Sequence, residues 1–164
     1  MEAQRPTKAP LQAGTTPSGE FVRSGLDVSG GMSRVMRTGA CACGAVRYEL
    51  SGELTTVTFC HCSKCRRWHG HVGAYTAIER SGFRLVEQRG LKWHAAAKTV
   101  RRGFCGECGS SLLWDEDGDP RIAICAGTID APTGLTSKAH IYVGSKGDYY
   151  PLVDDGLLQF QELP

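Results

Sequence analysis

The sequence predicts a mainly β fold, a sandwich or tent of short antiparallel strands organised around bound metal. Short runs that alternate in polarity, or are rich in β-branched residues, recur between glycine turns about every ten residues, as in all-β proteins. Seven of the eight cysteines fall into three tight clusters. These clusters are Cys41-x-Cys43, Cys60-x-Cys62-x-x-Cys65 and Cys105-x-x-Cys108. Clusters with this spacing predict metal sites.

The chain divides into a tail and one domain. With 164 residues it is long enough to bury a core without disulfides, and its 22% charged and 41% hydrophobic residues are typical of a globular protein. Residues 1–35 are rich in Pro, Gly, Ser and Thr and carry few large apolar side chains. Such a segment buries too little surface to offset its ordering entropy. We therefore expect a disordered tail over 1–35 and a zinc-binding domain over 36–164.

The elements of the domain follow from periodicity. The first predicted strand, 45–50, alternates in polarity and ends at Ser51-Gly52. The second, 54–59, is rich in Thr and Val and leads directly into Cys60. Residues 63–71 and 91–97 are expected to form short helices. The other predicted strands are 72–78, 83–86, 99–104, 110–114, 121–125 and 140–143.

The cysteines are expected to be reduced ligands rather than disulfides. No apolar run approaches the ~20 residues that span a bilayer, and no signal-peptide stretch is present, so we expect a cytoplasmic protein without a membrane partner. Dense cysteine pairs in a reducing compartment bind metal more often than they pair. Seven thiolates divide into one four-ligand and one three-ligand site, which predicts two Zn²⁺ ions per chain. Seven thiolates and two Zn²⁺ change the formal charge from +2 to −1, so no nucleic-acid partner is expected.

The first and third clusters are predicted to form one closed site. A two-residue spacer lets Cys105 and Cys108 reach the same ion, and the one-residue spacer puts Cys41 and Cys43 on one face of an extended segment. A zinc ribbon of the nucleic-acid-binding kind usually has ~15–20 residues between its pairs. Here sixty-one residues separate Cys43 from Cys105, which argues against a ribbon.

The middle cluster offers three thiolates, and Cys60, Cys62 and Cys65 are the predicted catalytic residues. Zn²⁺ held by three protein ligands keeps a fourth position for water or an incoming thiol. The alternative is a second closed structural site, with a nearby histidine as the fourth ligand. The candidates for that role are His61, His69 and His71. The residues alone leave both possibilities open.

Basic side chains follow the middle cluster directly. Arg66 and Arg67 are predicted to bind the carboxylates of a small anionic thiol. Alternatively they form a solvated face that offsets the thiolate charge. Cys125 alternates with Ile122 and Ile124, so we expect it in the core and not at a metal.

Other polar residues have less specific expectations. Lys98, Arg101 and Arg102 approach the Cys105 cluster and are expected to be structural. His140 begins a predicted strand and is expected to anchor a hydrogen-bond network.

The motifs together resemble a known family. Cys-x-Cys-Gly at 41–44, Phe-Cys-His-Cys-Ser-x-Cys-Arg-Arg at 59–67 and Phe-Cys-x-x-Cys-Gly-Ser-x-Leu at 104–112 look like the glutathione-dependent formaldehyde-activating (GFA) family, which includes centromere protein V. The resemblance covers about residues 37–163. It implies a β-tent with two zinc ions, one structural and held by Cys41, Cys43, Cys105 and Cys108. The catalytic ion would be held by Cys60, Cys62 and Cys65 and would accept water or glutathione.

The resemblance also implies a reaction. The family's named activity joins glutathione and formaldehyde to S-hydroxymethylglutathione, which is carbon–sulfur lyase chemistry. We therefore expect a zinc enzyme that acts on a thiol adduct, with His61 or His69 as the proton carrier. Two alternatives from other classes are a non-enzymatic zinc-stabilised interaction module and a thiol redox switch.

Overall fold

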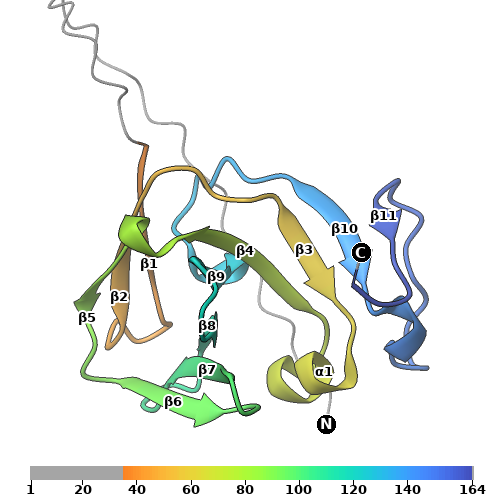
Figure 1. Ribbon diagram of the computed structural model, residues 1–164, viewed down its shortest axis with the longest axis horizontal. Helices are drawn as coiled ribbons and strands as arrows, with labels where there is room; N and C mark the ends of the chain where they lie inside the picture. The colour runs from red at the N-terminus through yellow and green to blue at the C-terminus, as the bar shows by residue number, and fades with distance from the viewer. Residues whose placement is uncertain (1–34, 164) are drawn as a thin grey trace, which may run out of the picture. The chain divides into compact units, whose positions relative to one another are not determined.

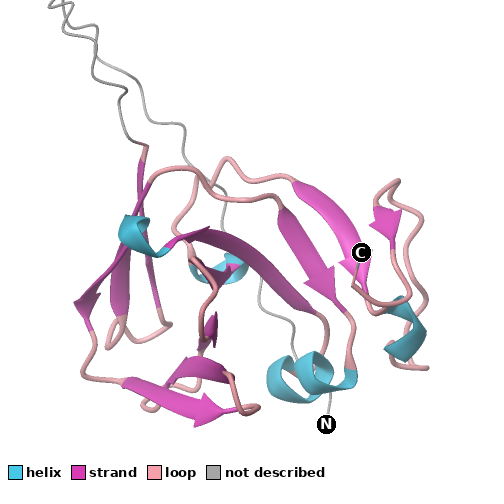
Figure 2. Cartoon of the chain, in the orientation of Figure 1, coloured by secondary structure: helices cyan, strands magenta, loops and turns pink. Residues whose placement is uncertain are grey.

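The computed structural model describes residues 35–163 (Figure 1). They form eleven strands, one α-helix and three single-turn 3-10 helices, arranged in two sheets (Figure 2). All but the last residue of the predicted tail lies outside the described residues. The prediction of a mainly β fold of short strands is confirmed.

The smaller sheet is antiparallel and has three strands in the order β1-β2-β5. Its strands are β1 (Met36–Ala40), β2 (Arg47–Ser51) and β5 (Phe83–Glu87). The turn between β1 and β2 carries the first cysteine pair, so this sheet supplies one half of the predicted four-cysteine site.

The larger sheet has eight strands in the order β11-β10-β3-β4-β9-β8-β7-β6. Its pairs are antiparallel except for β10 with β3 and β10 with β11, which are parallel. The parallel pairs arise because the chain returns from β9 through a long connection and lays β10 beside β3. The strands are β3 (Val57–Cys60), β4 (Gly73–Glu79), β6 (Leu91–Ala95), β7 (Val100–Cys105), β8 (Ser111–Glu116), β9 (Arg121–Cys125), β10 (Ser137–Ile141) and β11 (Leu158–Gln159).

Helical structure is confined to short connections. Helix α1 (Ser63–His69) joins β3 to β4, and it ends at Gly70, whose φ of 76° lies in the left-handed region. The 3-10 turns are η1 (Arg80–Gly82), η2 (Ala126–Thr128) and η3 (Val143–Ser145). Among residues 35–163, no helix has the length and apolarity needed to cross a membrane.

The hydrophobic core packs β2 against β4, β8 and β9. Its fully buried side chains include Tyr48, Leu50, Ile78, Leu113 and Ile124. Each apolar side chain buried in this way contributes about 1.5–3 kcal/mol relative to exposure. The core therefore fixes the two sheets to one another, and with them the cysteine-bearing turns at their ends.

The sequence located most elements correctly, but the helix predicted at 91–97 is wrong. Residues Leu91–Ala95 form β6, which pairs with β7. Trp93 lies opposite Gly103 in that pair, and its ring fills the space that a side chain at Gly103 would occupy. Tertiary pairing therefore overrides the weak local pattern. Strand β1 and the two-residue β11 were not predicted.

A buried carboxylate on β8 links this strand to β7 and to η1, the turn after β4. Asp115 on β8 is 3% exposed, and its two oxygens accept hydrogen bonds from Arg80 Nη2 at 2.5 Å and Arg101 Nε at 2.8 Å. Asp115→Ala should lower the free energy of unfolding by about 2 kcal/mol, because two charged donors lose their acceptor. Urea denaturation measures the change. The matched control is Asp117→Ala at an exposed position of the adjoining turn, and equal losses in both variants would contradict the role of the buried pair.

Candidate metal centre and adjoining pocket

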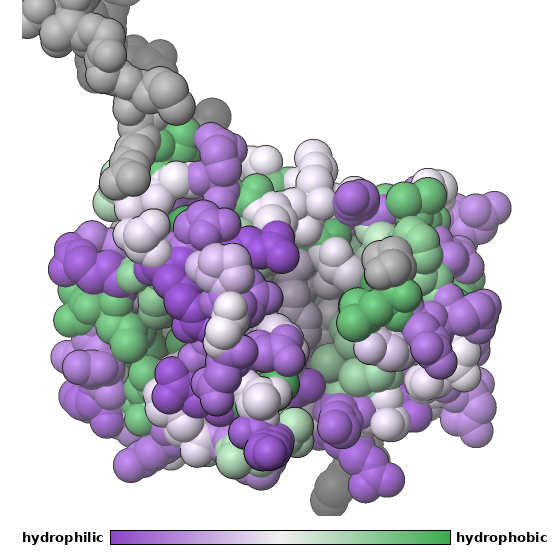
Figure 3. Space-filling view, in the orientation of Figure 1, coloured by the Kyte–Doolittle hydropathy of each residue, from purple (hydrophilic) through white to green (hydrophobic). Residues whose placement is uncertain are grey.

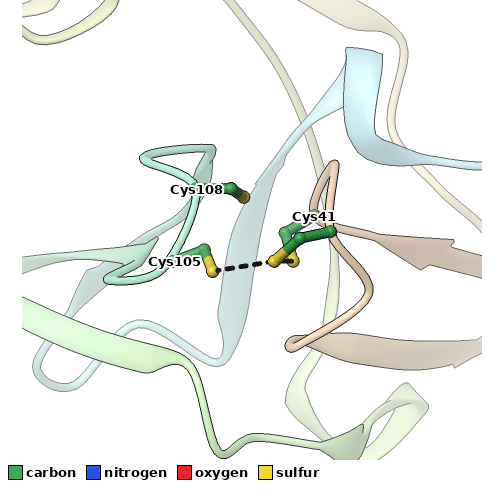
Figure 4. A group of neighbouring side chains, drawn as sticks. Cys41, Cys105 and Cys108 are labelled. Atoms are coloured by element: carbon green, nitrogen blue, oxygen red, sulfur yellow. Dashed lines mark hydrogen bonds between the residues drawn. The ribbon is translucent and has the colours of Figure 1, made fainter.

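Four cysteines from two turns converge on one point. Cys41 and Cys43 follow β1, whereas Cys105 ends β7 and Cys108 lies in the next turn, and all four sulfurs are within 4.8 Å of one another. Figure 4 shows the labelled thiols turned toward each other from these two turns. Cys43 Sγ is 3.6 Å from Cys41 Sγ and 3.7 Å from Cys105 Sγ. Sulfurs bound tetrahedrally to Zn²⁺ at about 2.3 Å are about 3.8 Å apart, so the spacing fits a zinc site.

Neighbouring donors hold two of these sulfurs in place. The backbone N–H of Val46 donates to Cys41 Sγ at 3.3 Å, and Ser110 Oγ lies 3.2 Å from Cys108 Sγ. The interaction with Ser110 lowers the pKa of Cys108 to about 5. Donors of this kind orient and stabilise thiolate ligands. The chemistry of the set is therefore that of a closed four-sulfur site.

The middle cluster brings three sulfurs together in the same way. Cys60 ends β3, Cys62 is the N-cap of α1, and Cys65 lies in the first turn of that helix; their sulfurs are within 4.8 Å of one another. The backbone N–H of Cys65 donates to Cys62 Sγ at 3.3 Å. Thus the strand-to-helix transition itself creates the cluster. Among the described residues, no fourth Cys, His, Asp or Glu side chain joins it.

A buried arginine balances the charge of this cluster. Arg102 on β7 is 4% exposed, and its Nη2 donates to Cys65 Sγ at 3.4 Å. The hydrogen bond from Cys60, together with Arg102, lowers the pKa of Cys65 to about 5 against the effect of burial. The same contact with Cys65, together with burial, raises the pKa of Cys60. Three adjacent thiols ionise together only when a cation lies among them, which is the donor chemistry of a metal site.

The histidines close to the cluster in sequence point to other partners. His61 Nδ1 is 2.8 Å from Tyr150 Oη and its Nε2 is 2.9 Å from His140 Nδ1, so both ring nitrogens are engaged. His69 Nε2 is 2.5 Å from Tyr75 Oη. His71 Nδ1 is 3.2 Å from Tyr149 Oη. None of the three places a ring nitrogen within 4.8 Å of all the sulfurs of the cluster, so none completes a four-ligand site in this arrangement.

A pocket of about 390 Å³ opens beside the three sulfurs. Its polar lining consists of the cysteine cluster together with Lys64, Tyr75, Arg102 and Tyr142. Arg102 Nη1 donates to Tyr75 Oη at 3.1 Å, which links the Tyr75 hydroxyl to the cluster. The remaining lining is aliphatic or aromatic and comes from the large sheet, the turn after β6 and Leu163.

Comparison with known proteins identifies the family. The profile described as "Glutathione-dependent formaldehyde-activating enzyme" matches residues 36–145, about two thirds of the chain. The chain belongs to the GFA family. A curated relative from Schizosaccharomyces pombe, "Uncharacterized lyase C29B12.13", is 25% identical over 114 residues, covering 68% of this chain and 82% of the relative. A structural-genomics crystal structure of a Rhodobacter sphaeroides protein aligns with a TM-score of 0.48 at 22% identity, covering 75% of this chain and 98% of that one.

The GFA match ends before the C-terminal segment of the chain. The sequence resemblance was expected to reach residue 163, but the profile stops at 145. The membership supports the cysteine motifs directly, because all three lie within the match. The further resemblance to centromere protein V stays an expectation.

The predicted thiol-binding arginines lie outside the pocket of this GFA-family chain. Arg66 Nε donates to the carbonyl of Ser145 at 3.1 Å, so its side chain is directed to the C-terminal segment. Arg67 is exposed, and neither residue is part of the described pocket lining. Their predicted role in binding a thiol stays a prediction. Lys64 and Arg102 are the cations that line the pocket.

Sequence reasoning missed Tyr75 and Arg102. Arg102 was expected to be structural near the Cys105 cluster, yet it contacts Cys65 of the middle cluster. The available signal was the period of two along β7, which puts Arg102 on the same face as Val100. The alternation along β7 does not reveal which strand or cysteine cluster packs against the side that carries Arg102. Cys125 is buried and, as expected, belongs to neither cysteine cluster.

Hydrogen bonds through His140 connect the C-terminal segment to the segment that carries the middle cluster. His61, which separates Cys60 from Cys62, contacts His140 on β10, and His140 Nε2 is 3.1 Å from Asp155 Oδ2. The hydrogen bond to His140 lowers the pKa of Asp155. The expected network around His140 is therefore present. It holds His61, the residue between Cys60 at the end of β3 and Cys62 at the start of α1.

Removing one hydroxyl tests this network. Tyr150→Phe should lower the free energy of unfolding by about 1 kcal/mol, because His61 loses a partner while it is 3% exposed. Tyr149→Phe is the matched control, since its hydroxyl contacts His71 near solvent and should change stability less. The urea midpoints of the two variants measure which substitution lowers stability more. A larger loss in Tyr149→Phe would contradict the proposed importance of the buried network.

Proposed function

We propose that the chain is a zinc-dependent lyase-type enzyme that makes or breaks a carbon–sulfur bond between a small thiol and an aldehyde. The family's printed description and the lyase name of the yeast relative support this reaction class. Glutathione is the thiol that the family description implies, and formaldehyde is its carbonyl partner. The product of that pair is S-hydroxymethylglutathione.

The observation that carries the proposal is the difference between the two cysteine clusters. One cluster has four converging sulfurs, whereas the other has three and borders a pocket. A closed set of four is typical of structural zinc, and three protein ligands with an open position are typical of catalytic zinc. In the proposal, Cys60, Cys62 and Cys65 hold the second ion, and the pocket gives the substrate access to it.

Bound at the three cysteines, Zn²⁺ supplies a positive centre that favours the thiolate form of a nearby substrate thiol at neutral pH. The protein residues supply charge balance. Three thiolates and one Zn²⁺ carry a net charge of −1, and the Arg102 guanidinium beside Cys65 offsets it. Because Arg102 is buried, this interaction is little screened by solvent.

Tyr75 is the pocket hydroxyl that we propose orients the substrate oxygen. Its Oη accepts a hydrogen bond from Arg102 Nη1 and lies next to His69 Nε2. Burial, with a smaller effect of Arg102, lowers the pKa of His69 to about 4, so its imidazole is neutral near pH 7 and accepts a hydrogen bond from the Tyr75 hydroxyl. One lone pair of Tyr75 Oη then remains for the hydroxyl of the adduct. His69 acts through Tyr75, whereas both ring nitrogens of His61 contact Tyr150 and His140.

Exchange spectroscopy by NMR tests the proposed reaction. Formaldehyde labelled with ¹³C is mixed with glutathione, and the exchange rate between free aldehyde and adduct is measured with and without the metal-loaded protein. The proposal predicts a protein-dependent increase that is proportional to enzyme concentration. No increase over the uncatalysed rate, for formaldehyde or any larger aldehyde, would overturn the lyase assignment.

A further inference from the structure

The pocket beside the three cysteines is larger and more apolar than formaldehyde requires. Beyond its polar end, its walls include Ala97, Val100, Trp114, Ala123, Ile141 and Leu163. They come from several strands and the C-terminal segment, so the cavity is a built feature of the fold. A volume of about 390 Å³ lies in the range of small-molecule sites, whereas formaldehyde has only two heavy atoms.

The charged side chains that line the pocket do not complement the charged groups of glutathione. That tripeptide carries two carboxylates and one ammonium at neutral pH, but the described lining contains no acidic side chain. The lining has two cationic side chains. Arg102 already donates to Cys65 and Tyr75, and Lys64 is exposed. Burying unpaired charges against apolar walls is costly. The charged part of such a thiol therefore stays at the mouth, near Lys64, and the interior is left for the carbonyl partner.

Hydrophobic surface also lies next to the C-terminal end of the described chain. On the face drawn in Figure 3 one hydrophobic area lies on the side of β11, and Leu163, which lines the pocket, is 63% exposed. An exposed leucine at a pocket wall presents apolar area that a ligand can cover. This supports an apolar occupant rather than a polar one.

Resting on the proposed thiol–aldehyde chemistry, we infer that the carbonyl partner is an aldehyde with an apolar substituent of several carbons, which the walls around Val100, Trp114 and Ala123 receive. The substrate class is then the hemithioacetals of apolar aldehydes. In the breakdown direction the C–S bond breaks and its electron pair leaves on sulfur. The carbinol O–H bond breaks as C=O forms, and the released proton ends on sulfur, which gives one thiol and one aldehyde.

A homologous series of aldehydes measures the preference. Formaldehyde, ethanal, butanal and hexanal are each combined with glutathione, and kcat/KM for the exchange is divided by the uncatalysed rate constant. Each methylene group that enters the pocket should raise this ratio about fourfold until the pocket is full. A ratio that is highest for formaldehyde and falls along the series would overturn the inference while leaving the lyase assignment intact.

Replacing alanines by leucine distinguishes an effect of the pocket volume from a general effect of mutation. Ala123→Leu fills part of the cavity from β9 and should reduce the hexanal-to-formaldehyde preference at least tenfold, whereas Ala95→Leu, exposed on β6 outside the lining, should leave it unchanged. If Ala123→Leu fails to fold, Ala97→Leu in the turn after β6 gives the same test. An unchanged preference in the folded pocket variant contradicts the inference.

Binding without reaction gives an independent readout. Hexan-1-ol is titrated into the ¹⁵N-labelled, metal-loaded chain with methanol as the control. Hexan-1-ol should produce saturable shifts at Trp114 and Ile141 that are lost in Ala123→Leu, and methanol should produce none. Absence of saturable shifts with hexan-1-ol overturns the apolar site. Saturable binding together with no aldehyde exchange would instead place the failure in the proposed reaction.

Discussion

Cys105→Ser is expected to abolish the folded state of the domain. Cys105 is fully buried and joins the end of β7 to the turn after β1 through the four-sulfur cluster. Structural zinc contributes about 10–16 kcal/mol in small zinc-binding peptides, which is as large as the total stability of a typical domain. A site that loses one of four thiolates retains only part of this binding free energy. Circular dichroism and NMR dispersion should therefore report an unfolded or molten chain.

Cys125→Ala is the matched control for that experiment. Cys125 is also a buried cysteine but lies outside both clusters, so its replacement should leave a small cavity and a cooperative, metal-loaded fold. If Cys105→Ser folds with wild-type stability and binds two ions, the structural role of the four-sulfur site is wrong.

Cys62→Ser is expected to remove activity and keep the fold. Cys62 is the N-cap of α1, and its side chain accepts the N–H of Cys65. Serine is among the preferred N-cap residues, so the helix start survives while one metal ligand is lost. We expect one metal ion per chain instead of two, and a fall in aldehyde–thiol exchange of at least about 100-fold, because losing even an outer-shell partner of a metal costs 10–100-fold.

Metal analysis and exchange NMR on the same sample check this result. Cys125→Ser serves as the control, since it makes the same chemical change outside the clusters. Retained exchange activity in Cys62→Ser, with the second ion absent, would show that the middle cluster is not where the reaction occurs.

Much of the fold could be predicted because its strands carry local patterns. Alternation and β-branched runs located most strands of both sheets, and α1 was expected from the residues that follow Cys62. The segment around Trp93 was assigned wrongly, since its strand conformation depends on pairing with Gly103 across the sheet. The parallel placement of β10 beside β3 was also hidden, because a long connection separates them and no local pattern encodes their register.

Only the part of the candidate site whose residues are close together in the sequence could be predicted. Cys60, Cys62 and Cys65 are close in sequence, so their convergence follows from one strand-to-helix turn. Tyr75 and Arg102 reach the same place from two other strands. Their positions depend on strand order and register, which one sequence does not supply. The predicted Arg66 and Arg67 follow the cluster directly, but a helix turn directs neighbouring side chains to different sides.

X-ray absorption at the zinc edge tests the central claim, an ion held by three cysteines with one position open to a thiol. Seven cysteine sulfurs shared by two ions give an average of 3.5 sulfur ligands per zinc. We predict this value for the loaded chain and a rise toward 4 when glutathione is added. An average that does not change with added thiol, because a histidine nitrogen or an eighth cysteine sulfur already completes the second site, would contradict the claim.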